Sequence, residues 1–525
     1  MRRRAFLAGG TALASAVTLA AGRATAEPPR LVTRERFGPQ TVRDLAMDRA
    51  SRRYVPRPAL PAAWRDFGYD AYRRVWFEPR RAVWGQSDLL FEMDLLHPGL
   101  YDWRPVKVDL VREGIASRFA FDPDLYVNAE LLPPVEEGEE IGFSGIRLRH
   151  VYPGEQWERE FAVFQGASYF RAIGAAQIYG LSARGLALRT GDPEGEEFPD
   201  FIRFWVEEPA AGERAVTVHA LLDSPSVAGA WRLRIMPGPA CVMEVECSIF
   251  PRVDLDHVGI APMTSMFLYD VTTAGRFGDF RPAVHDSDGL LALNAAGELL
   301  WRPLSNPAAL QVTSLVDENP RGFGLMQRAR RLSDFADLEA RYERRPSLWI
   351  EPQGDWGPGA VRLVEIPSDR EIYDNVVAYW RPRDPIPAGE QRRYNYRMIW
   401  GDEAVPETAP PRPEVARVLR TYVGQDFERR AIQVAIDFGP QSALDRPTPN
   451  EPSPPEWVPA DVVAHVSAGE ASVSAPTLQR NPETGGTRLA FTFDPGAANS
   501  LDLRAQLHRD DSVVTEVWLY RWTRS

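Results

Sequence analysis

The sequence is poor in the residues that several common kinds of site require. It contains one lysine, Lys107, among 61 basic residues, and residues 105–108 carry no glycine-rich motif around it. This excludes phosphate-binding loops that depend on a lysine, and nothing near Lys107 suggests a Schiff base. Seven scattered histidines and two cysteines do not form a zinc-site pattern, so we expect neither a metal nor an organic cofactor.

The two cysteines are not placed for a disulfide. Cys241 and Cys247 lie in a segment where apolar and polar residues alternate, which predicts a half-buried strand. Six residues of strand separate their Cα atoms by about 20 Å, whereas a disulfide needs less than about 7 Å. We therefore expect two buried thiols in a protein that is stabilised by its hydrophobic cores.

Long apolar runs and basic clusters are also missing beyond the N-terminus. Of 525 residues 44% are apolar and 26% charged. No internal stretch reaches the ~20 apolar residues of a membrane-spanning helix. A formal charge of −12 and a pI near 5.3 argue against nucleic acid as a partner. The composition predicts a globular protein with a sizeable core and no stable membrane insertion.

The first 26 residues have the pattern of an export signal. Arg3 and Arg4 begin the motif Arg-Arg-x-Phe-Leu, which precedes a weakly apolar stretch of small residues ending at Ala26. Such signals direct folded proteins through the twin-arginine route. Residues 1–26 are therefore predicted to be a twin-arginine signal peptide and the mature protein to be periplasmic, with an ordinary Sec signal or a membrane anchor as the alternative.

Strand-like alternation runs through the mature sequence, as at residues 231–235 and 513–520, with 46 prolines and 39 glycines between such runs. This pattern predicts an all-β protein built from antiparallel sandwiches. Two helices are expected, at residues 41–53 and 332–344, and Ser333 would cap the second.

A proline-rich, acidic segment at residues 402–417 predicts a semi-rigid linker. It would divide the chain into a large β-sandwich at residues 27–401 and an immunoglobulin-like β-sandwich at residues 418–525.

Two carboxylate clusters are the best candidates for chemistry. Residues 285–289 read His-Asp-Ser-Asp-Gly and residues 371–375 read Glu-Ile-Tyr-Asp-Asn, each at a predicted turn-to-strand junction. Glycosidic cleavage needs two carboxyl groups, one as acid and one as base, and aromatic residues with arginines suit sugar binding. On spacing alone, turns, strand caps or an adventitious calcium loop explain both clusters at least as well.

A set of longer motifs runs along the mature chain. They are residues 161–174 (Phe-Ala-Val-Phe-Gln-Gly-Ala-Ser-Tyr-Phe-Arg-Ala-Ile-Gly), 179–187, 195–199, 284–289, 349–352, 356–357 and 371–380. Together they resemble the periplasmic glucan biosynthesis proteins OpgG and OpgD over essentially the whole mature chain, with a thinner match in the C-terminal domain. The twin-arginine signal is similar to the OpgD branch rather than to the Sec-exported OpgG branch.

The resemblance implies a large sugar-binding sandwich with a long cleft, joined to a small immunoglobulin-like domain. It also implies a role in osmoregulated periplasmic glucans, and OpgD-like members act as β-1,2-glucanases that invert the anomeric carbon. Carried onto this sequence, the general acid is Asp374 and the base is Asp286. In the family the base acts through a relay of water and hydroxyls, so the carboxyl separation of roughly 6.5 to 9.5 Å usual for inverting enzymes need not hold.

These two roles require opposite environments. Asp374 must hold a proton near neutral pH, and Glu371 is a source of the negative charge that favours this. Asp286 must stay ionised, and His285 or Arg281 is expected to supply the cation. The expected substrate-binding residues are Glu371, Asp288, His285, Tyr373, Tyr169, Arg171, Trp349 and Trp356. Tyr169, Arg171, Tyr373, Trp349 and Trp356 would form the cleft walls, with core packing or ion pairing as the alternative for each.

The leading hypothesis is a periplasmic enzyme that cleaves linear β-1,2-glucan internally. Two alternatives stay open: a transglycosylase on the same scaffold, and a non-catalytic glucan carrier whose C-terminal sandwich docks other proteins. The expected partner is a β-glucan, while a homodimer and contact with an inner-membrane glucan synthase are left open. The sequence also leaves open whether residues 332–346 close over the cleft.

Overall fold

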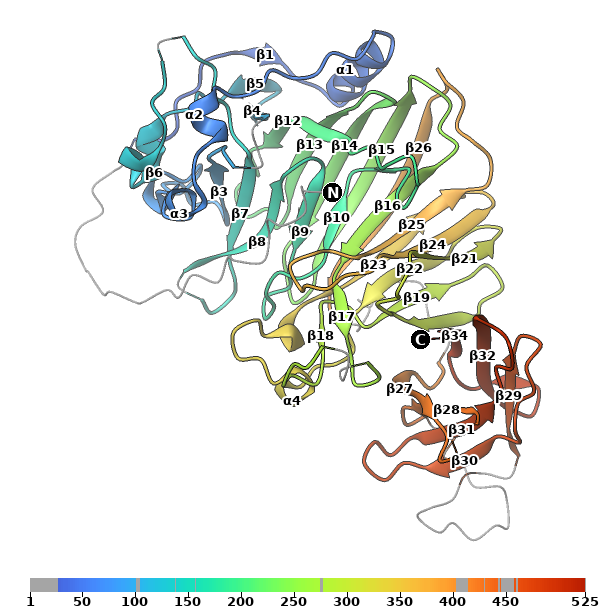
Figure 1. Ribbon diagram of the computed structural model, residues 1–525. Coiled ribbons are helices and arrows are strands. Elements are labelled where there is room, and N and C mark those ends of the chain that lie inside the picture. Colours follow the sequence, from blue (N-terminus) through green and yellow to red (C-terminus); the bar gives the residue numbers. More distant parts are fainter. Residues whose placement is uncertain are drawn as a thin grey trace.

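The computed structural model (Figure 1) describes residues 27–100, 104–136, 138–155, 157–273, 277–402, 414–428, 430–441, 444, 458 and 461–524. The predicted signal peptide at residues 1–26 lies outside these residues, as does most of the predicted linker at residues 402–417. Strands far outnumber helices in the described part of the chain. The predicted all-β class is confirmed.

The larger of the two main sheets continues from the N-terminal part of the chain into the C-terminal strands, and 16 of its strands lie in the described residues. In order across the sheet they are β1 (Glu35–Arg36), β5 (Ile115–Arg118), β4 (Lys107–Arg112), β12 (Asp200–Glu207), β13 (Val216–Asp223), β14 (Val227–Met236), β15 (Cys241–Pro251), β26 (Arg392–Gly401), β23 (Ser347–Gln353), β22 (Gly322–Met326), β19 (Gly289–Leu293), β20 (Leu299–Pro303), β34 (Val517–Thr523), β32 (Ser500–Arg509) and β29 (Val462–Ala468), with β33 (Ser512–Val513) paired to β32. The pairs β4–β12 and β20–β34 are parallel.

The second main sheet is antiparallel and has 10 strands in the described residues. Its order is β21 (Gln311–Asp317), β24 (Gly359–Glu365), β25 (Val376–Pro382), β16 (Val258–Ser265), β10 (Ser182–Arg184), β9 (Tyr169–Ala172), β8 (Glu158–Gln165), β7 (Gly145–Val151) and β3 (Phe91–Leu96), with β11 (Ala187–Leu188) paired to β16. Two short ribbons complete this part of the fold: β2 (Trp76–Phe77) with β6 (Tyr126–Val127), and β17 (Phe267–Tyr269) with β18 (Val284–His285).

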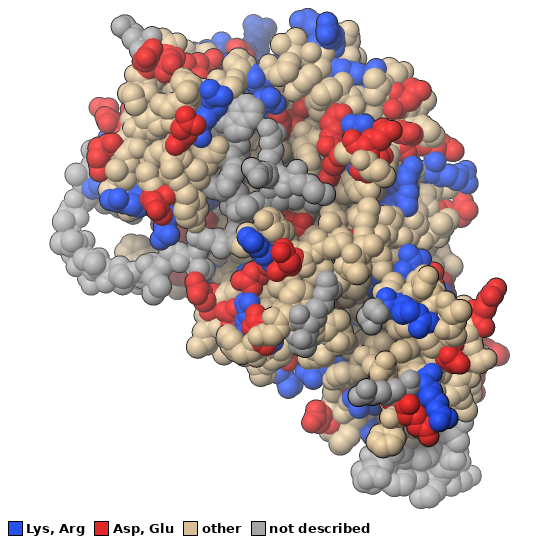
Figure 2. Space-filling model, viewed as in Figure 1, with Lys and Arg blue, Asp and Glu red and all other residues tan. Residues whose placement is uncertain are grey.

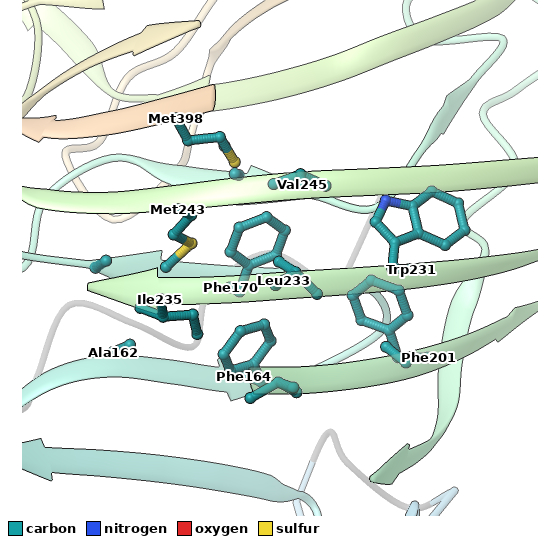
Figure 3. Close-up of a cluster of buried hydrophobic side chains, with 14 of the residues drawn as sticks. Ala162, Phe164, Phe170, Phe201, Trp231, Leu233, Ile235, Met243, Val245 and Met398 are labelled. Atoms are coloured by element: carbon teal, nitrogen blue, oxygen red, sulfur yellow. The ribbon is translucent and has the colours of Figure 1, made fainter. Parts of the chain in front are cut away.

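The two main sheets pack face to face around one large hydrophobic core (Figure 3). Phe164 and Phe170 come from the smaller sheet, while Trp231, Leu233 and Val245 come from the larger one, and all five are almost fully buried. Because side chains alternate across a strand, each sheet gives one face to this core. The molecule therefore contains a large β-sandwich.

Strand β15 shows how the sequence pattern produces this arrangement. Cys241 and Cys247 are buried free thiols on its inner face, as predicted. On the opposite face Glu246 pairs with Arg232 of β14 at 2.7 Å. The alternation seen in the sequence is thus the alternation between core and outer face.

The first predicted helix is confirmed over α1 (Thr41–Ala50), three residues shorter than residues 41–53. Val42 and Ala46 of α1 pack against Trp205 and Leu221 on the outer face of the larger sheet. The other described helices are single turns: α2 (Ala62–Arg65), α3 (Tyr69–Tyr72), α4 (Leu332–Phe335), η1 (Pro79–Arg81), η2 (Pro123–Leu125), η3 (Ala129–Leu131) and η5 (Tyr342–Arg344).

The predicted helix at residues 332–344 is wrong. It stops after one turn at α4, because Ala336 adopts a left-handed conformation with φ 54°. The Asp337 carboxylate then accepts hydrogen bonds from the backbone of Glu339 and Ala340, at 2.9 and 2.8 Å, and so forms a turn. Ser333 does not cap α4, whose N-cap is Arg331.

The C-terminal part is a second, smaller sandwich. Its second layer is the sheet β27 (Val418–Gln425), β28 (Ile432–Phe438), β31 (Thr487–Phe493) and β30 (Thr477–Arg480), which packs on β34, β32 and β29 of the larger sheet. The core between them also contains Trp301 and Trp349 from the large sandwich. The two sandwiches therefore share both a sheet and a core.

On the face seen in Figure 2, acidic and basic side chains of the described residues are interspersed. In that part of the chain no helix is long and apolar enough to cross a membrane.

Candidate active site

The two carboxylate motifs meet at the end of strand β16. The backbone N–H of Asp286 donates to the Met266 carbonyl at 2.8 Å, and that of Asn375 donates to the Ser265 carbonyl at 3.0 Å. Asn375 also exchanges side-chain hydrogen bonds with both backbone groups of Phe267, at 2.8 and 2.9 Å. Residues 265–267 thus hold the segment of Asp286 on one side and that of Asp374 on the other.

Asp286 is buried, with 5% of its surface exposed, and forms an ion pair with Arg345. Burial raises the pKa of Asp286, the Arg345 guanidinium opposes this, and the negative charge of Asp374 adds to the rise. Arg171 of β9 is also buried, and the carboxylates of Asp374 and Asp286 both act on it electrostatically. These four side chains therefore form one electrostatic cluster, and Asp374 is its half-buried member.

His285 is not the cation that keeps Asp286 ionised. Its ring is stacked on Phe267, with centroids 5.4 Å apart, and its edge contacts Phe335. Burial lowers the pKa of His285 to about 3, so the imidazole is neutral at physiological pH. The expectation for His285 is wrong, and the cation on Asp286 is Arg345, whose sequence context, Arg-Arg-Pro at residues 344–346, gives no signal of this role.

Arg281 binds other carboxylates instead. Its guanidinium contacts Asp279 at 2.7 Å, Asp337 at 2.8 Å and Glu371 at 2.7 Å. Glu371 is therefore paired with a cation, which weakens its negative influence on Asp374. We call this arrangement the Arg281 clamp, because it ties together the loops around residues 279, 337 and 371.

Asp288 stabilises the His-Asp-Ser-Asp-Gly motif through hydrogen bonds to the backbone. Its carboxylate accepts hydrogen bonds from the backbone N–H groups of Arg328 at 2.8 Å and Ala329 at 3.1 Å. Its own N–H donates to the Met326 carbonyl at 2.8 Å. The structure therefore places Asp288 against the chain that follows β22.

The expected cleft-wall residues fall into two groups. Tyr169 and Arg171 lie on one face of β9, and the guanidinium of Arg184 lies 4.8 Å from the Tyr169 ring. Tyr373 is exposed on the turn that precedes Asp374. Arg171 is thus part of the carboxylate cluster itself, and Tyr373 is the residue directly before Asp374.

The two tryptophans lie elsewhere. Trp349 is buried in the core shared with the C-terminal sandwich, and Trp356 packs edge-on against Tyr394 and Tyr396 in the large core. The structure does not bring either indole to the carboxylate cluster.

Arg184 of β10 is a buried arginine that pairs across the strands with Tyr169, and the sequence analysis did not single it out. It donates to Thr264 at 2.8 Å and to Glu196 at 2.5 Å, so it fixes the loop after β11 to the sheet. Its position within the motif at residues 179–187 was the available signal. Among the described residues, no group of three or more His, Cys, Asp or Glu side chains is placed to hold a metal ion.

Residues 37–522 match the family described as periplasmic glucan biosynthesis protein, MdoG. A glucans biosynthesis protein G from Vibrio cholerae serotype O1 is 44% identical over 490 residues, covering 93% of this chain and 87% of that protein. One from Shewanella sp. strain MR-4 is 43% identical over 507 residues, covering 95% and 90%.

A heparan sulfate lyase mutant, HepC from Pedobacter heparinus, aligns in structure over 56% of this chain and 38% of its own, with a TM-score of 0.22 and 6% identity. The relatives above bear the G name, so the expected likeness to the OpgD branch still rests on the signal sequence. The family match covers all but the ends of the 525-residue chain and includes both carboxylate motifs. The chain belongs to the periplasmic glucan biosynthesis family MdoG.

Proposed function

We propose that this protein is a periplasmic hydrolase that cleaves β-1,2-glucan within the chain and inverts the anomeric carbon. The observation that carries the proposal is that Asp286 and Asp374 flank the same short segment, residues 265–267. One carboxyl group is buried against an arginine and the other is half-buried, so their environments differ. Two carboxyl groups in unlike environments are what an acid and base pair requires. Membership of the periplasmic glucan biosynthesis family supports a periplasmic glucan as the substrate class.

In this mechanism Asp374 gives its proton to the glycosidic oxygen as the bond to the anomeric carbon breaks. Water attacks that carbon from the opposite face, and the proton it loses passes to Asp286, directly or through a relay of hydroxyls. Asp286 must be ionised to accept it. The ion pair with Arg345 favours that form against the effect of burial.

The test is to incubate the mature protein with linear β-1,2-glucan and to follow reducing ends, product sizes and anomeric form. We expect new reducing ends with inverted anomers, and a rate about 10²- to 10⁴-fold lower for Asp374→Asn, because the general acid is lost. Asp502→Asn is the matched control, since Asp502 is paired with Arg521 on the C-terminal sandwich, and it should leave the rate unchanged. Wild-type turnover by Asp374→Asn would remove Asp374 from the mechanism.

Two other outcomes identify the alternatives. Larger or cyclic products without new reducing ends would make the protein a transglycosylase, because transfer creates no reducing end. Glucan binding without turnover by the wild type would favour a non-catalytic carrier. Export through the twin-arginine route, with a β-glucan as the partner, belongs to the same proposal and rests on Arg3 and Arg4 of the signal sequence.

A further inference from the structure

One buried ion pair joins the C-terminal sandwich to the chain beside the carboxylate motifs. Glu516, immediately before β34, pairs with Arg328, two residues after β22, at 2.7 Å. Their side chains are 0% and 5% exposed. A charge this deeply buried is stable only when its partner is present, so the two groups depend on one another.

The C-terminal sandwich surrounds the Arg328 side chain further. Its guanidinium donates to the Val418 carbonyl of β27 at 2.7 Å, and the Val418 N–H donates to the Glu516 carboxylate at 2.8 Å. The guanidinium also lies 3.5 Å from the ring centroid of Trp301. Arg328 is therefore fixed at its charged end by groups of the C-terminal sandwich and of β20.

The main chain at Arg328 leads directly to the motif that carries Asp286. The N–H of Arg328 donates to the Asp288 carboxylate at 2.8 Å. The neighbouring Gln327 side chain donates to the His285 carbonyl at 2.9 Å. Gln327 and Arg328, which follow β22, thus bind His285 and Asp288, the residues on either side of Asp286 and Ser287.

The glycine of the motif belongs to the same assembly. A side chain on Gly289 would overlap the indole of Trp301, so only glycine permits Trp301 to lie there. The same indole also contacts the guanidinium of Arg328. A displacement of Arg328 would therefore change the packing at Gly289, through Trp301, as well as the hydrogen bond to Asp288.

We propose that the C-terminal sandwich is a positioning element of the candidate site: Glu516, acting through Arg328, sets the place of Asp288 and so of the turn that carries Asp286. Glu516 itself does not reach the reacting atoms. The mechanical link stands on the contacts above, whereas its consequence for catalysis rests on the proposed function.

The decisive experiment compares two carboxylates of the C-terminal sandwich in the full-length mature protein. Glu516→Gln leaves Arg328 without its anion. Asp437→Asn is the matched control, because Asp437 is 3% exposed and bound by Arg488 through two hydrogen bonds of 2.7 Å, and none of the contacts described here connects it to Asp288. Hydrogen exchange of the amides at residues 286–289 and 327–329 is followed in both.

We expect exchange at these amides to rise about tenfold or more in Glu516→Gln and to stay near the wild-type rate in Asp437→Asn, at a temperature where both are folded. Equal exchange in the two variants would overturn the proposal, since Glu516 would then serve only general stability. This readout requires no enzymatic activity, so it decides the matter even if the protein cleaves no glucan.

Glu516→Gln can fail to fold, because it leaves the buried Arg328 guanidinium without a negatively charged partner. The double variant Arg328→Met/Glu516→Leu removes both charges together and is then used in its place. We expect it to fold and still to show faster exchange at residues 327–329, because the contacts to Val418 and Glu516 are gone. Wild-type exchange in this double variant would refute the link.

Activity provides the second arm. If the protein hydrolyses β-1,2-glucan, Glu516→Gln should lower kcat about tenfold with little change in KM, since the base is misplaced while the binding residues remain. In an Asp288→Asn background Glu516→Gln should cause little further loss of kcat, because both act through the same contact. Additive losses would show that Glu516 does not act through Asp288.

Discussion

Burial acts on the neighbouring residues His285 and Asp286 in opposite directions. It lowers the pKa of His285 to about 3 and raises the pKa of Asp286, because in both cases the charged form is disfavoured. Arg345 limits the effect on Asp286 by supplying an adjacent positive charge. At physiological pH the motif therefore contains a neutral imidazole beside a carboxylate whose ionisation depends on Arg345.

Because His285 is neutral when folded, it should lower the free energy of unfolding as the pH falls. An unfolded histidine takes up a proton below about 6.5, whereas the folded one does so only near pH 3, so the unfolded state gains protons first as the pH falls. Relative to His285→Gln, the wild type should lose up to about 1.4 kcal/mol of unfolding free energy per pH unit in this range. Urea unfolding of both proteins between about pH 7 and about pH 5 measures this difference.

Asp286→Asn is the control, because the pH dependence of stability that Asp286 causes has the opposite sign to that of His285. The raised pKa of Asp286 means that the folded state takes up a proton before the unfolded state, so the wild type should gain stability relative to this variant as the pH falls. Parallel pH profiles for the wild type and His285→Gln would contradict the assignment of a neutral His285.

The sequence predicted part of this residue-level picture. Asp286 and Asp374 were selected through motif resemblance, and the structure places their two segments on either side of residues 265–267. Arg345 was missed because it is 59 residues from Asp286, and a contact over that separation leaves no trace in local spacing. His285 was misjudged because its charge depends on burial between Phe267 and Phe335, which the motif does not reveal.

Between elements, three loops around the candidate site are joined by the Arg281 clamp. Arg281 is 15% exposed and lies among three carboxylates, of which Glu371 precedes the proposed acid by three residues. Without the guanidinium, Asp279, Asp337 and Glu371 would repel one another. The clamp also explains the failed helix at residues 332–344, since Asp337 turns the chain and is bound by Arg281, an interaction outside the reach of helical periodicity.

Arg281→Gln should therefore loosen the loops without unfolding the protein. We expect faster limited proteolysis within residues 332–344 and, if glucan is the substrate, about a tenfold lower kcat/KM from poorer placement of the acid. Arg509→Gln is the matched control, because Arg509 is 14% exposed and paired with Asp461 on the C-terminal sandwich. Equal proteolysis of the two variants would show that the clamp does not restrain the loops.

At the scale of the whole molecule, the two sandwiches are continuous rather than merely linked. Strand β20 pairs in parallel with β34, matching Leu300 to Val517 and Trp301 to Trp518. The shared core contains Trp349 from the large sandwich and Trp518 from the small one. The proline-rich segment at residues 402–417 predicted a semi-rigid linker and a domain boundary. Sequence composition carries no information on the pairing of strands as far apart in the chain as β20 and β34.

This continuity has a consequence for unfolding. Leu489 is fully buried in β31, on the layer of the C-terminal sandwich farther from β20, so Leu489→Ala should cost about 2–5 kcal/mol through a cavity. Because β34 and the shared core couple the two parts, we expect calorimetry to show one transition that moves to lower temperature as a whole. A sandwich that unfolded alone would instead give an early, small transition while the large one kept its wild-type melting temperature. If the small sandwich unfolded first, Arg328 would lose its ion pair with Glu516 while the large sandwich was still folded. We expect a single transition because groups of both sandwiches bind Arg328, which in turn binds Asp288 of the candidate site.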